Sequence, residues 1–281
     1  MTVATEKFEK LRETIRSYGS CIVAYSGGVD SVFLARVAHD VLGERSLAVI
    51  ADSHSLPRRE LAEALELGER FNFPVRVIKT SEFDNPSYLA NPLNRCYFCK
   101  HELFAELVPL AKTENFAVIC YGENASDVGD FRPGATAAAE HAVRAPLKEV
   151  GLTKAEIREL SAQLGLPTAD KPQMACLSSR IPTGEAVSPE KLRMIEEAEY
   201  VLRDLGFYDV RVRHHELSAK QSRARIEVGP TEVKRLTEND LLAQVTAALK
   251  KMGYSEVTVD LNGYHRGNLS GATARVALPK A

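Results

Sequence analysis

A strand, a double-glycine turn and a helix follow one another between residues 21 and 40, and this unit constrains the fold more than any other stretch. The apolar run Cys21-Ile-Val-Ala-Tyr25 predicts a buried parallel strand. Ser26-Gly27-Gly28 then has to turn sharply, because residues 31–40 have the apolar spacing of a helix. Adjacent glycines allow the backbone to approach a ligand closely, and N–H groups at a helix N-terminus attract anions. We therefore expect a phosphate site at this turn, although a glycine pair alone would indicate only an ordinary turn.

The complete string Ser26-Gly27-Gly28-Val29-Asp30-Ser31 resembles the PP-loop of ATP pyrophosphatases, which cleave ATP between the α and β phosphates. It is neither a Walker A loop nor a G-x-G-x-x-G turn. The resemblance implies that ATP and Mg²⁺ are cofactors and that AMP is transferred to a substrate. The hydroxyls of Ser26 and Ser31 add hydrogen-bond donors, and Asp30 is the candidate catalytic residue that holds magnesium or orients the loop.

The composition is that of an ordinary globular protein, with 44% hydrophobic and 26% charged residues in a chain of 281. Its 36 basic and 38 acidic residues give a formal charge of −2, which does not favour nucleic acid or an anionic membrane as a partner. No apolar run approaches the ~18 residues of a membrane-spanning helix. The acidic N-terminus is unlike a signal peptide, and an odd number of cysteines, five, indicates reduced thiols. We therefore expect a cytoplasmic protein, and also a homo-oligomer.

Strands and helices alternate through the first two thirds of the chain. This alternation predicts parallel crossovers, and hence an α/β domain with a doubly wound parallel sheet in residues 1–184. Residues 185–281 predict a smaller α+β domain with a charged interior face on its first two strands. The predicted strands are 21–25, 46–51, 74–78, 115–121, 210–213, 225–228 and 256–261, and the predicted helices include 4–18, 58–71, 96–112, 189–205 and 231–251.

Polar residues stand at the carboxyl ends of the predicted parallel strands, where open α/β sheets bind ligands. Ser53 follows the second strand, and the loop Gly122–Gly134 follows the fourth. A merely solvated acidic loop is the alternative for residues 123–130. The candidate residues for nucleotide or magnesium binding are Ala24, Ser26, Gly27, Gly28, Asp30, Ser31, Ser53, Lys100, Gly122, Asn124, Asp127, Asp130 and Arg132.

The five cysteines fall into two groups. Cys21 and Cys120 sit within apolar strands, where cysteine behaves as a small buried hydrophobe. Cys96 and Cys99 form a C-x-x-C motif at a helix start, and Cys176 lies in a polar stretch without periodicity. A lone C-x-x-C is compatible with a redox dithiol, half of a zinc site or iron–sulfur ligands. Three exposed cysteines without a fourth suit a [4Fe–4S] cluster that has one iron left open.

Two arginines, Arg211 and Arg213, alternate on one face of a predicted strand, and Glu227 is expected opposite them on the next strand. Paired arginines suit a clamp for phosphate or carboxylate, because the guanidinium group binds both oxygens of such groups. A cross-strand ion pair on the surface fits the sequence equally well.

Four motifs together resemble the LarE family across nearly the whole chain: Ser26–Ser31, Cys96–Lys100, Gly122–Gly134 and Cys176–Pro182. The resemblance implies an ATP-dependent sulfur transferase that helps to make the nickel-pincer nucleotide cofactor of lactate racemase. Its substrate would be pyridinium-3,5-biscarboxylate mononucleotide, which is adenylated on a carboxylate. By the same resemblance, Arg211, Arg213, Glu199 and Glu227 belong to the site for the substrate's phosphate.

The resemblance also assigns the sulfur chemistry to Cys176, in one of two ways. In the sacrificial route its thiolate displaces AMP, and breaking its own C–S bond leaves a thiocarboxylate and dehydroalanine. Members of the family with a single cysteine lack Cys96 and Cys99. The presence of all three cysteines is similar to the subgroup that is thought to hold a [4Fe–4S] cluster, and it favours repeated turnover.

Three alternatives remain open from the sequence. A tRNA-thiolating PP-loop enzyme also uses three cysteines, but the charge of −2 and the lack of a basic run do not favour it. A PP-loop synthetase of the amidotransferase type would have no use for the cysteines. A nucleotide sensor without enzymatic activity is the third alternative.

Overall fold

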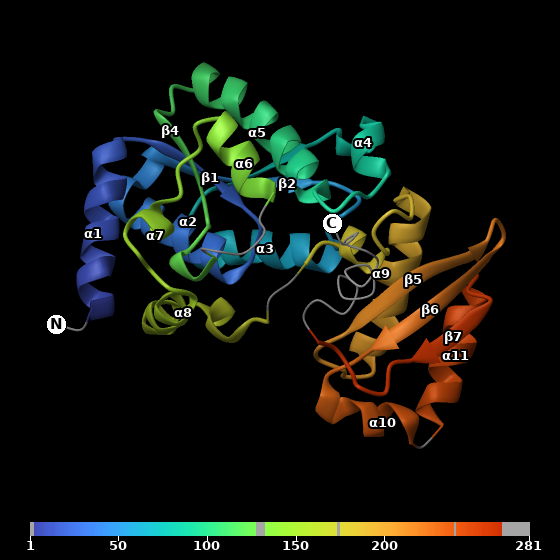
Figure 1. Cartoon of the computed structure of the whole chain (residues 1–281). Helices are drawn as coiled ribbons and strands as arrows, with labels where there is room; N and C mark the ends of the chain where they lie inside the picture. Colours follow the sequence, from blue (N-terminus) through green and yellow to red (C-terminus); the bar gives the residue numbers. More distant parts are fainter. Residues whose placement is uncertain (1–2, 128–132, 173–174, 239, 266–281) are drawn as a thin grey trace, which may run out of the picture. The chain divides into compact units, whose positions relative to one another are not determined.

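The computed structural model describes residues 3–127, 133–172, 175–238 and 240–265. The chain forms two compact units (Figure 1). The first unit comprises Met1–Asp84 and Asn94–Met174, and the second comprises Asn85–Leu93 and Ala175–Ala281. The domain boundary after Gly184 stays a prediction.

The first unit is built on a four-stranded parallel sheet with the order β3-β2-β1-β4, which confirms the predicted α/β class. In the central strand, Val23 lies opposite Ala48 on one side and Cys120 on the other. The two inner strands, β1 and β2, are almost wholly buried, as expected for apolar strands that are covered on both faces. The strands are β1 (Cys21–Tyr25), β2 (Ser46–Asp52), β3 (Val75–Lys79) and β4 (Val118–Tyr121).

Helices cover both faces of this sheet, as in a doubly wound fold (Figure 1). On one face, Val23 and Tyr25 of β1 share a core with α1 (Val3–Tyr18), α2 (Val29–Leu42), α3 (Arg58–Arg70) and α8 (Lys154–Gln163). On the other face, Ile22 and Ala24 share a core with α5 (Arg95–Thr113) and α6 (Pro133–Glu140). Alternate residues of one strand thus supply two separate cores.

The strand order reverses between β1 and β4, since β2 and β3 lie on the other side of β1. In open α/β sheets such a switch point opens a crevice at the carboxyl ends of the two strands. The predicted PP-loop leaves β1 there, and the polar loop after Tyr121 leaves β4. The shorter elements of the first unit are η1 (Gly43–Arg45), η2 (Glu82–Asp84), η3 (Ala125–Asp127), α7 (Pro146–Glu149) and η4 (Pro167–Asp170).

The second unit contains a three-stranded sheet with the order β5-β6-β7. β5 (Arg211–Ser218) is antiparallel to β6 (Gln221–Glu227), and β7 (Glu256–Val259) is parallel to β6. An apolar core joins this sheet to α9 (Pro189–Asp204), α10 (Val233–Thr237) and α11 (Leu241–Lys251).

Three features of the second unit differ from or add to the predicted elements. The single helix predicted for 231–251 is wrong: η6 (Pro230–Glu232) leads into α10, and α11 starts only after Asp240, whose φ of +58° is left-handed. The short α4 (Pro86–Leu89) joins this unit through the Tyr88 hydroxyl, which lies 2.9 Å from Ser178 Oγ. Ser178 belongs to η5 (Leu177–Arg180).

Across the described residues of both units, no helix combines the length and apolar character that crossing a membrane requires.

Candidate active site

The turn after β1 contains two glycines and is held closed by a serine side chain. Gly27 has a φ of +70°, and a Cβ atom there would lie 2.9 Å from the Cβ of Ala64 in α3. Gly28 is the N-cap of α2 and has no side chain that would accept a hydrogen bond from the first helical turn. Ser31 holds the loop closed, because its Oγ accepts from Ser26 N at 3.2 Å and donates to Gly28 O at 3.1 Å. The turn therefore has the features of a helix N-terminus that binds an anion.

The end of β4 packs directly against this helix start. A Cβ atom on Gly122 would lie 3.0 Å from Ser31 N and 3.1 Å from Asp30 Cβ, so glycine permits the close approach. Asn124 Nδ2 donates to Asp30 Oδ1 at 3.3 Å, and its backbone N–H donates to Asp127 Oδ2 at 3.2 Å. Asp30 and Asn124, which are 94 positions apart in the sequence, therefore meet in the crevice.

Two lysines at this crevice were not predicted from the sequence. Lys154 Nζ donates to Asp30 Oδ2 at 2.6 Å. Lys171 Nζ donates to Glu60 at 2.7 Å and to Glu63 at 3.0 Å, both in α3, and to Gly27 O at 3.4 Å. Lys154 stands at a variable position of the capping box Thr153–Glu156, and nothing in the sequence links either lysine to the loop, so only the folded structure reveals the contact.

The remaining nucleotide candidates have less connection with the loop. Ser53 Oγ accepts from Ser55 N at 3.2 Å, within the turn that follows β2. Ala24 is buried in β1, and Lys100 lies 5.8 Å from the ring centre of Phe104 in its own helix. Their roles in nucleotide binding stay predictions. Asp130 and Arg132 lie outside the described residues.

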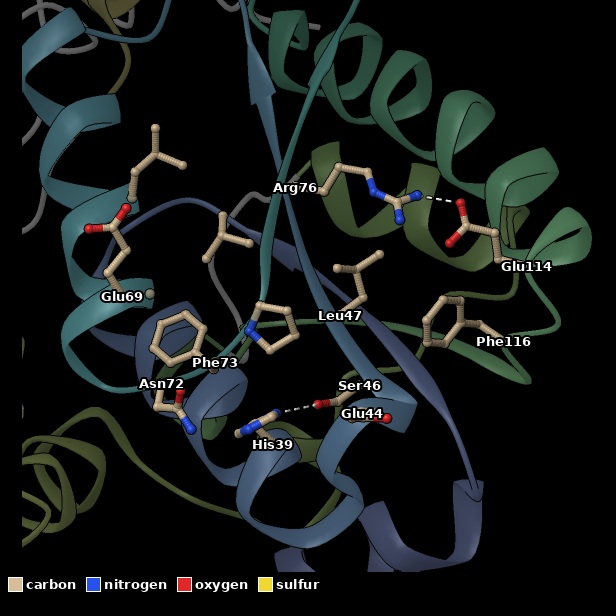
Figure 2. A pocket seen from close by; sticks show the side chains of 14 residues that line it. His39, Glu44, Ser46, Leu47, Glu69, Asn72, Phe73, Arg76, Glu114 and Phe116 are labelled. Carbon is tan, nitrogen blue, oxygen red and sulfur yellow. Dashed lines mark hydrogen bonds and ion pairs between the residues drawn. The ribbon is translucent and has the colours of Figure 1, made fainter.

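A pocket of about 770 Å³ in the first unit lies at the amino ends of the parallel strands (Figure 2). Ser46 and Leu47 line it at the amino end of β2, and Val75 and Arg76 line it at the amino end of β3. Arg76 forms an ion pair with Glu114 at its rim. Because the strands are parallel, this pocket is separated from the nucleotide crevice by the length of the sheet.

Cys96 and Cys99 occupy the first turn of α5, where a spacing of three residues places two side chains on one face of a helix. Cys96 is exposed and Cys99 is half-buried. Cys21 and Cys120 are fully buried in the core, as predicted, and the contact with Cys21 together with burial raises the pKa of the Cys120 thiol well above its usual value. Among the described residues of each unit, no three His, Cys, Asp or Glu side chains gather as a ready metal site.

Cys176 lies in the second unit, half-buried, immediately before η5. Its carbonyl oxygen accepts from Ser179 Oγ at 2.7 Å and from Arg180 Nη1 at 3.0 Å. Arg180 also donates to the carbonyl of Ala175 at 2.5 Å. The backbone on both sides of the thiol is thus held by one arginine.

Arg180 is in turn held by Glu199 of α9. Both side chains are almost completely buried, and the guanidinium group donates to the two carboxylate oxygens at 2.8 and 3.1 Å. Burial alone would lower the pKa of Arg180, but the Glu199 carboxylate raises it above its usual value. Burial opposes ionisation of Glu199 too, yet the attraction of Arg180 lowers its pKa. Glu199 also accepts from Val212 N at 3.0 Å, which ties the Cys176 segment to β5.

The two arginines that flank Val212 continue this network. Arg213 donates to Glu227 Oε2 from Nε at 3.0 Å and from Nη2 at 2.7 Å, and its Nη1 donates to Ser179 O at 3.1 Å. Arg211 packs its guanidinium group 4.6 Å from the ring centre of Tyr264. Burial, and then repulsion by Arg180, lowers the pKa of Arg211.

This buried network confirms the predicted charged interior face on the first two strands of the C-terminal region. The Arg213–Glu227 pair is not a surface pair, because Glu227 is completely buried. Three arginines (Arg180, Arg211 and Arg213) are buried together with two glutamates (Glu199 and Glu227). Arg211 also pairs with Asp209 at 3.4 Å, and Arg225 donates to Glu227 at 2.9 Å. Guanidinium groups held in this way are suited to bind a phosphate or carboxylate.

Comparisons with known proteins agree with these features. No family model matches the chain. An uncharacterized protein, slr1717, of Synechocystis sp. is 42% identical over 264 residues, which cover 94% of this chain and 97% of that protein. The pyridinium-3,5-bisthiocarboxylic acid mononucleotide synthase of Lactiplantibacillus plantarum is 30% identical over 278 residues, which cover 99% of this chain and 98% of that protein. A GMP synthase of Brucella melitensis biotype 1 is 27% identical over 72% of this chain and 44% of its own length.

The similarity to the synthase extends over both compact units, and the weaker similarity to GMP synthases fits a PP-loop enzyme. The chain is an enzyme with adenylating activity. It belongs to the LarE family of ATP-dependent sulfur transferases.

Proposed function

We propose that this enzyme adenylates a carboxylate of pyridinium-3,5-biscarboxylate mononucleotide and converts it to a thiocarboxylate. The product would serve the maturation of the nickel-pincer cofactor of lactate racemase. The relative from Lactiplantibacillus plantarum, a pyridinium-3,5-bisthiocarboxylic acid mononucleotide synthase, supports the choice of substrate. The observation that carries the proposal is the network that joins the backbone of Cys176 to the buried arginines of β5.

Adenylation has to make a poor leaving group into a good one. A carboxylate oxygen of the substrate attacks the α phosphorus of ATP, the bond to the β-phosphate oxygen breaks, and its electron pair leaves with pyrophosphate. The N–H groups of the first turn of α2 and the hydroxyls of Ser26 and Ser31 are suited to stabilise the charge that develops on the phosphates. Asp30 is the carboxylate at this turn that would hold Mg²⁺.

The phosphate of the mononucleotide substrate needs a separate cationic site. Arg211 and Arg213 supply guanidinium groups for it, and Tyr264 packs against both. Glu199 and Glu227 are acceptors only, so we expect them not to contact the phosphate. Glu227 orients Arg213 directly, and Glu199 holds Arg180 and the backbone of Val212 between the two arginines.

Sulfur transfer to the activated carboxyl carbon would depend on Cys176 as a ligand of the group that carries the sulfur. We propose that Cys96, Cys99 and Cys176 together hold a [4Fe–4S] cluster. Thiolates are the ordinary ligands of such clusters, and two cysteines one helical turn apart fit as two of the three. When bound, the cluster would supply sulfide sulfur from its open iron. Arg180 and Ser179 hold the backbone of Cys176 so that its thiol stays in one orientation.

Exchange of labelled pyrophosphate into ATP tests the adenylation. We expect exchange that depends on the pyridinium dicarboxylate mononucleotide, because a reversible acyl adenylate has to form before pyrophosphate can return. Exchange without that substrate, or none with it, would contradict the proposed substrate. Bulk tRNA is the comparison compound for the thiolating alternative.

A cysteine series tests the proposed cluster. After anaerobic reconstitution, Cys96→Ala, Cys99→Ala and Cys176→Ala should each lower bound iron and sulfur transfer to a similar degree, since all three are needed as ligands. Cys21→Ala and Cys120→Ala are the matched controls, because both thiols are buried in the core. Iron content that does not change in Cys96→Ala and Cys99→Ala would rule out the cluster.

A further inference from the structure

The nucleotide loop of this enzyme contains no cation of its own. Residues 26–31 are serine, glycine, valine and aspartate, whereas a Walker A loop includes a lysine that reaches the β and γ phosphates. During adenylation the leaving pyrophosphate gains negative charge, and stabilising it calls for a positive group at the loop. A cation from another part of the chain is therefore expected there.

The geometry points to Lys154 as this cation: we propose that its ammonium group binds the β and γ phosphates of ATP and stabilises the departing pyrophosphate. Lys154 is the first residue of α8, and its Nζ lies 2.6 Å from Asp30 Oδ2. Asp30 is in the first turn of α2, so the ammonium group is placed at the helix end where the phosphates should bind. The inference rests on the nucleotide site proposed for residues 26–31.

The backbone of Lys154 is fixed on two sides. Thr153 and Glu156 form a capping box, in which Thr153 N donates to Glu156 Oε2 at 2.8 Å. The N–H of Lys154 itself donates to Ser126 Oγ at 3.0 Å, and Ser126 belongs to the loop that follows β4. The side chain thus extends toward the crevice from a rigid base, as a positioned phosphate ligand requires.

A comparison with Lys171 shows why Lys154 is the better candidate. The side chain of Lys171 is 11% exposed, and its ammonium group donates to two carboxylates and to Gly27 O. Three donors are all that a lysine has, so Lys171 serves as a tether between its segment and the loop. Lys154 is 31% exposed, and its bond to Asp30 uses one of three donors. The other donors can bind phosphate oxygens while that bond persists.

The proposed role fits the balance of the reaction. The substrate oxygen forms its bond to the α phosphorus, and the electron pair of the broken P–O bond stays on pyrophosphate. Lys154 keeps its proton throughout and offsets the new charge as an ammonium ion. It therefore contacts the leaving group and leaves the AMP portion to other residues.

The test compares Lys154→Gln with Lys7→Gln in the full chain. The Lys7–Glu156 pair is a close match for the Lys154–Asp30 pair: the distances are 2.7 and 2.6 Å, and the exposures are 27%/19% and 31%/20%. Both pairs involve the N-terminal turn of α8, but only Lys154 contacts the loop. Calorimetry with ATP, pyrophosphate and AMP should show ATP and pyrophosphate affinity reduced about 10- to 100-fold in Lys154→Gln, with AMP affinity unchanged. Lys7→Gln should bind all three as the wild type does.

Unchanged ATP affinity in Lys154→Gln, or an equal loss for AMP, would overturn the proposal. A second measurement on the wild type does not depend on the folding of the variant. ATP and pyrophosphate should protect Lys154, but not Lys7, from acetylation by acetic anhydride, as read by mass spectrometry; AMP should not protect it. Equal labelling of Lys154 with and without ATP would also overturn the proposal. A wild type that binds no ATP would instead contradict the nucleotide site itself, so the two failures are distinguishable.

Discussion

The nucleotide crevice and the arginine network are both suited to bind phosphate, but they are built from different parts of the chain. At the crevice the anion site consists mainly of backbone N–H groups, and six consecutive residues make the turn. In the network, side chains from η5, α9, β5 and β6 carry the charges, and most of them are buried. This difference determines which substitutions each region tolerates. The crevice is sensitive to an added side chain, whereas the network is sensitive to a lost charge.

Glu199→Ala should have the largest effect on stability. It leaves Arg180, which is fully buried, without its carboxylate partner, and breaking a buried pair in this way costs about 3 to 5 kcal/mol of unfolding free energy. Denaturant unfolding of the second unit measures this change. Glu197→Ala is the control, because Glu197 and Arg193 form an exposed pair at 4.0 Å, and less than about 1 kcal/mol is expected. Equal effects of the two changes would show that burial of the network is energetically unimportant.

Gly28→Val should abolish measurable ATP binding while the protein stays folded. A Cβ atom at Gly28 meets only Ser26 Oγ at 3.5 Å, so the fold accommodates it, but a branched side chain would fill the place of the phosphate. Calorimetry should show a loss of at least about 100-fold in ATP affinity. Asp30→Ala should also prevent ATP binding. Wild-type affinity in either variant would mean that the loop is only structural.

His214 of β5 gives the second unit a pH-dependent stability. Burial, and then repulsion by Lys191, lowers the pKa of His214 to about 4 from 6.5. The unfolded state therefore binds more protons between these values, and stability that is fully present above pH 6.5 is lost as pH falls toward 4. The loss amounts to at most about 3 kcal/mol. Unfolding free energies of wild type and His214→Gln across this range measure it; parallel curves would exclude His214 as the cause.

Arg213→Lys should have the smallest and most selective effect. Lysine keeps the charge but cannot bind Glu227 and a phosphate with the same planar geometry, so affinity for the mononucleotide substrate should fall roughly tenfold. ATP affinity should not change, because the substitution leaves the crevice residues intact. Arg211→Lys should behave in the same way. An equal loss of ATP and substrate affinity would assign these arginines to the nucleotide.

The same contrast explains how much could be predicted from the sequence. Strand β1, its turn and α2 were predicted correctly because the signal lies in consecutive residues. The parallel sheet followed from the alternation of apolar runs and amphipathic segments. The break between α10 and α11 was missed, because no glycine or proline marks it in the sequence; Glu238 is extended and Asp240 is left-handed.

Contacts between distant residues were beyond local patterns. The bond between Lys154 and Asp30 joins residues 124 positions apart, and nothing in the sequence around the lysine points to the loop. The arginines of β5 were recognised by their alternation, but their burial and the pairing of Arg213 with Glu227 depend on the packing of α9 and β6. Long-range ion pairs leave little trace in a single sequence, because any charged residue on a surface looks the same.

Mass analysis after turnover tests most directly whether this enzyme transfers sulfur to an activated carboxylate. It also decides whether that sulfur comes from a cluster or from Cys176 itself. Reconstituted protein, limiting with respect to ATP, pyridinium-3,5-biscarboxylate mononucleotide and added sulfide, would be incubated without oxygen, and the masses of the product and of the intact protein measured. We predict AMP, a product in which sulfur replaces a carboxyl oxygen, more than one sulfur delivered per chain, and an unchanged protein mass. Loss of one H₂S from Cys176 for each product would contradict the cluster route, and absence of the thiocarboxylate would contradict the proposed function.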